Sequence, residues 1–223
     1  MAKIKLNLIS GDCITKKVTY TIDKTGLIIE CNRSKEYCYL KNNNLDTLNA
    51  LPTDGIVCEK VGLFKKQPLT EITVIQCSKR EFSTKGFTGK MHFDSGYSNA
   101  ITDIKIPFEI SFKIDSNNVE KFIDYAYNNS YKNNIDFNDL YEGLELHVNN
   151  AIKEVIGESG IYSIEDLETN SLEWGEEILE VLNNSKKVTS TGLIFTNISI
   201  QIVDDMMHRA EKKRVQHNKI LTK

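Results

Sequence analysis

The sequence predicts an α+β fold, and three observations lead to that prediction. First, six apolar residues alternate with five non-apolar ones along Ile104–Ile114, which is the period of a β-strand with one buried face. Second, three helical segments follow this strand. Third, an alternating strand from Gly192 to Val203 comes next and leads into a last helix. This order of elements favours an assembly or scaffold role.

Residues 1–65 are predicted to form a β-rich N-terminal region. Its candidate strands are Ile4–Ile9, Val18–Asp23, Gly26–Cys31, Tyr37–Lys41 and Gly55–Val61. The turn residues Asp23–Gly26 predict a hairpin between the second and third strands. Alternation within the second strand predicts that Thr19 and Tyr20 face opposite ways.

A short helix is predicted just before Pro52. Leu45, Leu48 and Leu51 are spaced three apart, and proline stops a helix. Leu69–Cys77 is expected to be the next strand.

The long strand at Ile104–Ile114 follows a Gly-rich, basic stretch, Ser83–Lys90, which is expected to be a loop or hairpin. Pro107 falls on the polar face of this strand. Because proline cannot donate a ladder hydrogen bond, its presence predicts an edge position or a bulge.

The helices carry clear start and stop signals. Asn117–Tyr127 follows Asp115, a capping residue, and Ser163 resembles the N-cap of a helix that closes at Asn183–Ser185. Asp136 is expected to cap the helix between them. The apolar stripe of that helix comprises Phe137, Leu140, Tyr141, Leu144, Val148, Ala151, Ile152, Val155 and Ile156.

The composition is that of an ordinary globular chain. Of 223 residues, 40% are hydrophobic and 26% are charged, and the net charge is −3, so no global basic field favours nucleic-acid binding. No window approaches the roughly 18 apolar residues of a membrane span. The N-terminus lacks the apolar core of a signal peptide, so a cytoplasmic location is expected.

Five cysteines lie in the first 77 residues, at Cys13, Cys31, Cys38, Cys58 and Cys77, with no CxxC pair. In a cytoplasmic setting they are expected to be reduced and mostly buried.

No catalytic, cofactor-binding or metal-binding residues are assigned. Gly86–Lys90 superficially resembles a phosphate-binding loop, but it has two residues between its glycines instead of four, and Met91 follows the lysine. No histidine lies in an HxH or HExxH pattern. Asp204 and Asp205 are expected to interact favourably with a helix N-terminus, with metal binding as the alternative.

The C-terminal segment, residues 204–223, is predicted to be a short basic helix. A low-area contact for an oligomer or partner is expected at Val203, Met206, Met207 and Ala210. A contact for an anionic surface is expected at Arg209, Lys212, Lys213 and Arg214. The alternative is a solvated or frayed end.

The order of elements resembles the SPFH/band-7 family (stomatin, prohibitin, flotillin), especially its soluble bacterial branch. The segments that carry the resemblance are Leu69–Phe82, Gly86–Asp94, Ile104–Phe122 and Ser190–Val203. This resemblance implies an SPFH-like α+β domain over residues 66–203, with a twisted, antiparallel-rich sheet and helices packed on one face. It implies side-by-side homo-oligomers, often near membranes, and no catalysis. The chain departs from the family in lacking an N-terminal anchor and a long coiled coil.

The expected function is therefore that of a non-catalytic, oligomerising scaffold. Such a scaffold could also contact the inner face of a membrane peripherally. Two alternatives stay open at this point. One is a structural subunit of a phage-like or other large particle. The other is an enzyme, which would need a cleft with paired carboxylates or a perturbed cysteine.

Overall fold

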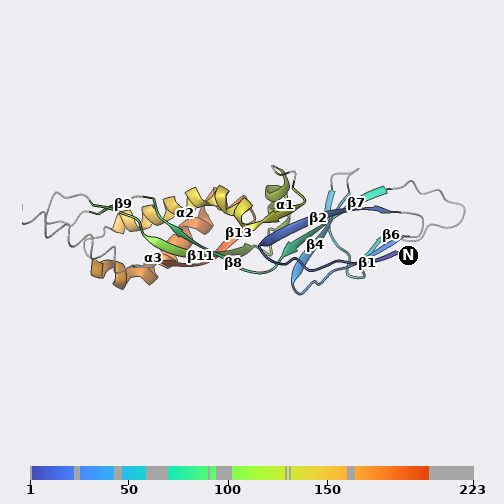
Figure 1. The fold of residues 1–223 in the computed structure, drawn as a ribbon, viewed down its shortest axis with the longest axis horizontal. Helices are drawn as coiled ribbons and strands as arrows, with labels where there is room; N and C mark the ends of the chain where they lie inside the picture. The colour runs from blue at the N-terminus through green and yellow to red at the C-terminus, as the bar shows by residue number, and fades with distance from the viewer. Residues whose placement is uncertain are drawn as a thin grey trace, which may run out of the picture. The chain divides into compact units, whose positions relative to one another are not determined.

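The chain is a mixed α+β protein with two compact units (Figure 1). The computed structural model describes residues 2–22, 26–42, 47–58, 70–89, 91–93, 102–128, 130, 132–159 and 164–200. Unit 1 comprises residues 1–80 and 114–142, and unit 2 comprises residues 81–113 and 143–223. Each unit is therefore built from segments that are far apart in the sequence.

Unit 1 contains an antiparallel five-stranded sheet. Its strands, in spatial order, are β12 (Asn134–Asp136), β2 (Cys13–Ile22), β7 (Thr70–Ser78), β4 (Glu36–Asn42) and β5 (Thr47–Ala50). The alternation predicted in β2 is confirmed, because Thr19 and Thr21 are exposed whereas Ile22 is buried. The central strand β7 is buried along most of its length, as a strand with neighbours on both sides should be.

A smaller sheet in unit 1 joins β1 (Ala2–Lys5), β3 (Leu27–Glu30) and β6 (Ile56–Cys58). β1 runs parallel to β3, and β6 runs antiparallel to it. One hydrophobic cluster draws side chains from both sheets, namely Leu6, Ile22, Leu27, Ile29, Cys38, Leu40, Leu51 and Val74.

Gly55 allows the loop before β6 to approach β3 closely. Its φ is +73°, and an added Cβ would lie 2.3 Å from the carbonyl oxygen of Ile29. The backbone N–H of Ile29 donates to the Gly55 carbonyl oxygen at 2.8 Å. Only glycine fits this position without strain.

Two sequence predictions in unit 1 are wrong. The hairpin expected around Asp23–Gly26 does not form, because β2 pairs with β7 and β12 whereas β3 pairs with β1 and β6. Where the short helix is expected, at Leu45, Leu48 and Leu51, the described residues Thr47–Ala50 form strand β5, which pairs with β4. In both places strand pairing overrides the local pattern.

Helix α1 (Val119–Asn128) begins as predicted after Asp115, whose Oδ1 accepts the backbone N–H of Asn117 at 3.0 Å. The helix buries Val119, Phe122, Ile123 and Ala126. Near its end, the Tyr127 hydroxyl lies 3.1 Å from Thr15 Oγ1 on β2. This contact ties α1 to the five-stranded sheet.

Unit 2 is built on a sheet with the strand order β13 (Leu193–Ile200), β11 (Pro107–Ile114) and β8 (Phe82–Phe87). Alternation in both long strands and the helical run between them predict that the strands pair near each other. This prediction is confirmed, because β11 and β13 are neighbours. Residues expected on the buried face of β11 are indeed buried, namely Phe108, Ile110, Phe112 and Ile114. The rings of Phe112 and Phe195 meet edge-on, with centroids 5.8 Å apart.

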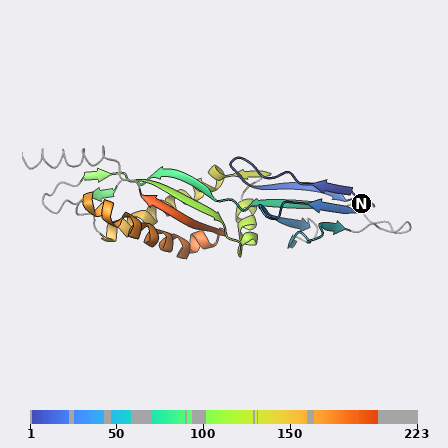
Figure 2. The same ribbon diagram turned by 90° about the horizontal axis from the view of Figure 1, so that it is seen from below.

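Three helices accompany this sheet: α2 (Phe137–Ser159), which enters unit 2 at residue 143, α3 (Ile164–Asn184) and α4 (Lys186–Thr189). Figure 2 shows α2 and α3 on one side of the strands. The apolar stripe predicted for α2 is buried, apart from the half-buried Tyr141. α3 runs through Gly175, where an added Cβ would lie 3.2 Å from the Ile198 carbonyl oxygen.

The expectations for Pro107 and for the Gly-rich stretch need correction. β11 is the central strand of its sheet, and Pro107 is its first residue, where proline is tolerated. Ile104 belongs to a separate short strand, β10 (Thr102–Ile104), which pairs with β9 (Met91–Phe93). The stretch that starts at Ser83 is largely strand β8, because it pairs residue by residue with β11.

Both predicted domain boundaries, after residues 65 and 203, lie outside the described residues. β7 follows the first of these boundaries and pairs with β2 and β4, which precede it. The sheet of unit 1 therefore continues across residue 65.

Candidate functional site

The contact residues predicted in the C-terminal segment lie outside the described residues. They are Val203, Met206, Met207, Ala210, Arg209, Lys212, Lys213 and Arg214, together with Asp204 and Asp205. Their roles stay predictions, so the candidate site must be sought in the rest of the chain.

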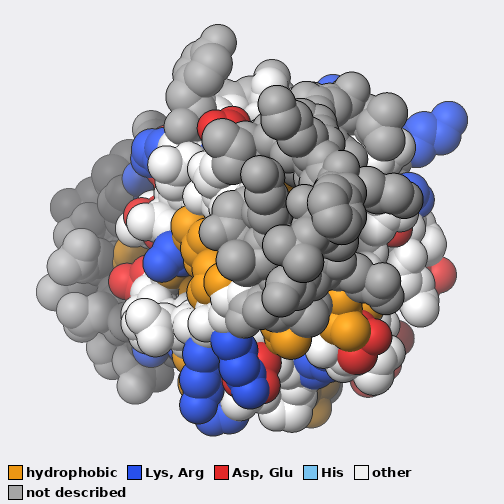
Figure 3. Space-filling view, turned by 90° about the vertical axis from the view of Figure 1, so that its right-hand side faces the viewer, with side chains coloured by type: hydrophobic (Ala, Val, Ile, Leu, Met, Phe, Trp, Pro, Cys, Tyr) orange, Lys and Arg blue, Asp and Glu red, His pale blue; other side chains and the backbone are white. Residues whose placement is uncertain are grey.

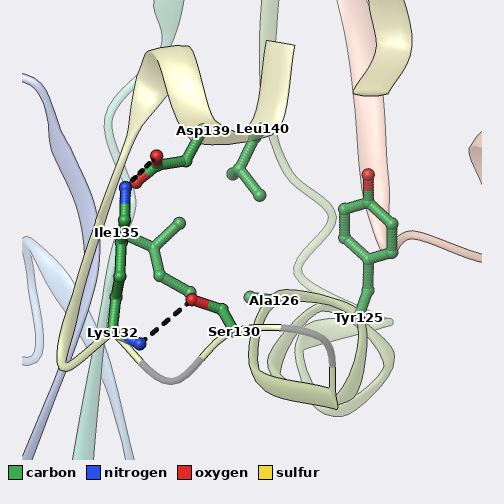
Figure 4. A pocket seen from close by; sticks show the side chains of 7 residues that line it. All are labelled: Tyr125, Ala126, Ser130, Lys132, Ile135, Asp139 and Leu140. Carbon is green, nitrogen blue, oxygen red and sulfur yellow. Dashed lines mark hydrogen bonds and ion pairs between the residues drawn. The ribbon is translucent and has the colours of Figure 1, made fainter. Parts of the chain in front are cut away.

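A pocket of about 250 Å³ lies between α1 and the start of α2 in unit 1 (Figure 4). Sequence reasoning did not find it, because α1, β12 and the first turn of α2 all contribute to it. The lining residues are Tyr125, Ala126, Ser130, Lys132, Ile135, Asp139 and Leu140.

Asp139 performs two structural tasks at the rim of this pocket. Its backbone N–H donates to Asp136 Oδ1 at 3.0 Å, and its Oδ2 accepts the Asp136 N–H at 3.3 Å. This reciprocal arrangement is a capping box at the start of α2, and it confirms Asp136 as the cap of that helix. The other oxygen, Oδ1, forms an ion pair with Lys132.

The two charged groups of the rim change each other's titration. The hydrogen bond from the Lys132 ammonium lowers the pKa of the Asp139 carboxyl group, and the same bond raises the pKa of Lys132. Both groups are therefore ionised at neutral pH, and their charges largely compensate each other. Neither is set up as a general acid or base.

The remaining walls offer little chemistry. Ala126, Ile135 and Leu140 are buried and apolar, and Tyr125 lies across the pocket from the Lys132–Asp139 pair (Figure 4). Burial raises the pKa of the Tyr125 phenol, so it stays protonated at neutral pH. The lining can contact a small molecule, but it includes no activated nucleophile.

Metal binding finds no support in the described residues, and the most deeply buried thiol is unreactive. There, no group of three or more His, Cys, Asp or Glu side chains could hold a metal ion. The described thiols Cys13, Cys31, Cys38 and Cys77 are free. Burial raises the pKa of Cys77 to about 12, which makes it an inert core thiol.

The Gly86–Lys90 segment does not adopt the strand–loop–helix arrangement of a phosphate-binding loop. Gly86 lies within β8, Thr88 is buried, and its Oγ1 accepts the backbone N–H of Ile106 at 2.9 Å. The next element is strand β9, not a helix. The segment therefore joins two strands and presents no helix N-terminus to a phosphate.

Exposed apolar side chains are the more informative surface feature of unit 2. Phe87, Leu146 and Leu172 are 62%, 65% and 85% exposed, on β8, α2 and α3 respectively. We call these three residues the unit 2 apolar set. The sequence could have indicated Phe87, because it falls on the polar face of an alternating strand. Single exposed apolar residues are common on protein surfaces, so these three indicate a contact only if the protein self-associates.

The view of unit 1 in Figure 3 shows no large surface of one charge among its described residues. Lys and Arg side chains lie beside Asp and Glu side chains, with small apolar areas between them. One exposed ion pair of this unit joins Lys3 Nζ and Glu30 Oε1 at 2.7 Å. On the described part of this one face, such intermixed charges do not form an electrostatic footprint for nucleic acid.

In the described part of the chain, no helix has the length and apolar character needed to cross a membrane. Comparisons of the sequence with models of known protein families and with curated proteins find no match.

Proposed function

We propose that this protein is a non-catalytic scaffold that self-associates through unit 2 and resembles the SPFH/band-7 type. One observation carries the proposal. β11 and β13 are neighbours in a single sheet, although a run of helices separates them in the sequence. That sheet also places helices on one side (Figure 2), as the resemblance leads us to expect.

The surface of unit 2 supports an assembly role. On the sheet face opposite Ile110 and Phe112, polar groups pair across the strands. The Ser83 and Ser111 hydroxyls lie 2.7 Å apart, and Lys85 pairs with Glu109 at 3.6 Å. The unit 2 apolar set lies exposed in the same unit and would gain from burial against a second copy.

The magnitude of this gain is modest for each residue. Full burial of one large apolar side chain contributes about 1.5–3 kcal/mol, and association also costs rotational and translational freedom. Several such residues must therefore act together, which favours a repeated, side-by-side contact over a single anchor.

The mass of the full chain in solution, measured by light scattering at tens of micromolar, tests the proposal. We expect oligomers, and negative-stain imaging should show their symmetry. Leu172→Ser and Phe87→Ser should each weaken association about tenfold or more, as expected for a loss near 1.4 kcal/mol. Leu8→Ser is the matched control, because Leu8 is an exposed apolar residue of unit 1 (44%).

A strict monomer at these concentrations would remove the scaffold proposal. Closed particles of a large, shell-like size would instead favour the structural subunit of a large particle. If Leu8→Ser weakens association equally, the contact does not lie specifically in unit 2.

A further inference from the structure

Two free thiols of unit 1, Cys31 and Cys38, lie at the same hydrophobic cluster. Cys38 is on β4, in the hydrophobic cluster between the two sheets, and is 8% exposed. Cys31 follows β3 directly, packs against that cluster and is only half-buried. The Cys31 side chain lies close enough to Cys38 to raise the pKa of the Cys38 thiol. An oxidant can therefore reach one sulfur while the other lies beside it.

A tight turn maintains this proximity. The Asn32 carbonyl oxygen accepts the backbone N–H groups of Lys35 and Glu36, both at 3.0 Å. Ser34 Oγ donates to Asn32 Oδ1 at 2.6 Å. These three bonds reverse the chain between β3 and β4, so the two sulfurs approach each other in the folded state without a long loop to close.

The surroundings assign different roles to the two sulfurs. Burial is the main cause that raises the pKa of Cys38, and the contact with Cys31 adds to it. Arg33 acts in the opposite sense, and its guanidinium group is anchored by donating to the Leu51 carbonyl oxygen at 3.0 Å. A buried, protonated thiol reacts slowly with oxidants, whereas a half-buried thiol can be reached by them. Cys31 is thus the sulfur attacked first.

We propose that Cys31 and Cys38 form a reversible disulfide when the protein meets a low-molecular-weight peroxide. The Cys31 thiolate attacks one peroxide oxygen, the O–O bond breaks, and a sulfenic acid and hydroxide form. The Cys38 sulfur then attacks the Cys31 sulfur, an S–S bond forms, and the sulfenic oxygen leaves as water. In total, two thiols are oxidised, and one hydrogen peroxide is reduced to two water molecules.

The disulfide would join the end of β3 to β4 and so connect the two sheets of unit 1 covalently. Because the two cysteines lie close together, a disulfide between them needs little movement of the backbone, provided that the sulfurs reach disulfide geometry. Thiol reductants should reverse the reaction, because the bond forms beside a half-exposed sulfur that exchange can reach.

The test uses the folded full chain treated with hydrogen peroxide, followed by alkylation of free thiols and peptide mapping by mass spectrometry. We expect one disulfide per chain, between Cys31 and Cys38, with a mass loss of two hydrogens that dithiothreitol reverses. Cys13→Ser is the matched control, since Cys13 is also half-buried in unit 1, and it should leave the yield unchanged.

Two variants test the order of events. Cys38→Ser should leave a sulfenic acid on Cys31 that dimedone traps, whereas Cys31→Ser should lose both the disulfide and the dimedone adduct. The proposal is overturned if Cys31 and Cys38 both stay alkylatable in wild-type protein while its methionines are oxidised. It is also overturned if the disulfide forms as readily in urea-unfolded protein, or if Cys13 or Cys77 takes the place of either sulfur. None of these results depends on the self-association of unit 2.

Discussion

Glu36 has a carboxylate that is almost completely removed from solvent, with 3% of the residue exposed. Its Oε1 accepts the backbone N–H of Ile9 at 2.5 Å, and its Oε2 accepts a hydrogen bond from Gln76 Nε2 at 2.9 Å. Gln76 Nε2 also donates to the Asn7 carbonyl oxygen at 3.0 Å. One side chain of β4 thereby connects β7 with the segment that follows β1. Buried charges persist in proteins only with such partners.

Replacement of Glu36 by alanine should lower the free energy of unfolding by about 2–4 kcal/mol, because the Ile9 N–H and the Gln76 amide lose a buried acceptor. Urea unfolding followed by circular dichroism measures this loss. Glu30→Ala is the control, since the Glu30 side chain is 47% exposed in its ion pair with Lys3 and should cost less than about 1 kcal/mol. Equal losses in both variants would contradict a structural role for the Glu36 network.

At the scale of single elements, β11 and the start of α2 show two different ways in which a segment is stabilised. β11 depends on burial, since Ile110 and Phe112 are both completely buried. The start of α2 depends on polar groups, because Asp136 and Asp139 satisfy each other's backbone N–H groups. Substitution and pH should therefore affect them differently.

Ile110→Asp should cost several kcal/mol of stability, because it places an unpaired carboxylate in the core of unit 2. Lys113→Asp changes charge on the same strand at an exposed position and should stay within about 0.5 kcal/mol of the wild type. Thermal unfolding compares the two variants. An unchanged melting temperature for Ile110→Asp would contradict the burial of this strand face.

Acid should weaken the start of α2 through Asp139. Its folded-state pKa lies below the unfolded value of about 3.9, because Lys132 stabilises the carboxylate. The stabilisation is therefore present above that unfolded value and is lost as pH falls through the folded value. Wild type should melt at a higher temperature than Asp139→Asn near neutral pH.

The difference between these two proteins should disappear as the pH falls below about 4. Melting curves recorded across the acid range at constant ionic strength provide the measurement. Added salt should reduce the difference near neutral pH, because the Lys132 side chain is 61% exposed. A difference that grows on acidification would contradict the assigned ion pair.

At the scale of the whole molecule, the two units and the C-terminal segment should contribute separately to assembly. Val203, Met206, Met207 and Ala210 offer three apolar side chains and an alanine, which can bury only a modest area. The segment alone should therefore bind weakly, and strong association needs the surfaces of unit 2.

Deletion of residues 206–223 should leave oligomers intact but abolish binding to vesicles that contain anionic lipid. The removed segment includes Arg209, Lys212, Lys213 and Arg214, which are predicted to contact such a surface. Wild-type binding should fade from low to physiological salt, as the screening length falls from about 30 Å to about 8 Å. Dissociation of the truncated chain to monomers, seen by light scattering, would instead assign the main contact to the deleted segment.

The sequence by itself determined the elements whose patterns are local. Alternation in β11 predicted which side chains are buried, because successive residues of a strand point to opposite faces. The stripe of α2 and its Asp136 cap followed from helical periodicity and from the unsatisfied N–H groups of a helix start. The neighbouring positions of β11 and β13 were predicted from the alternation in both strands and the helical run between them.

Only the tertiary structure decided which strands pair. The residue pattern of Thr47–Ala50 does not predict a strand, and pairing with the preceding strand β4 makes it one. β2 likewise pairs with β7, some fifty residues away, and not with its neighbour β3. The Lys132–Asp139 pair and the Cys31–Cys38 contact join residues that are close in the sequence, but they too depend on how the chain turns back on itself. Such contacts depend on how chain segments fold back on one another, and the periodicity of apolar residues does not predict that folding.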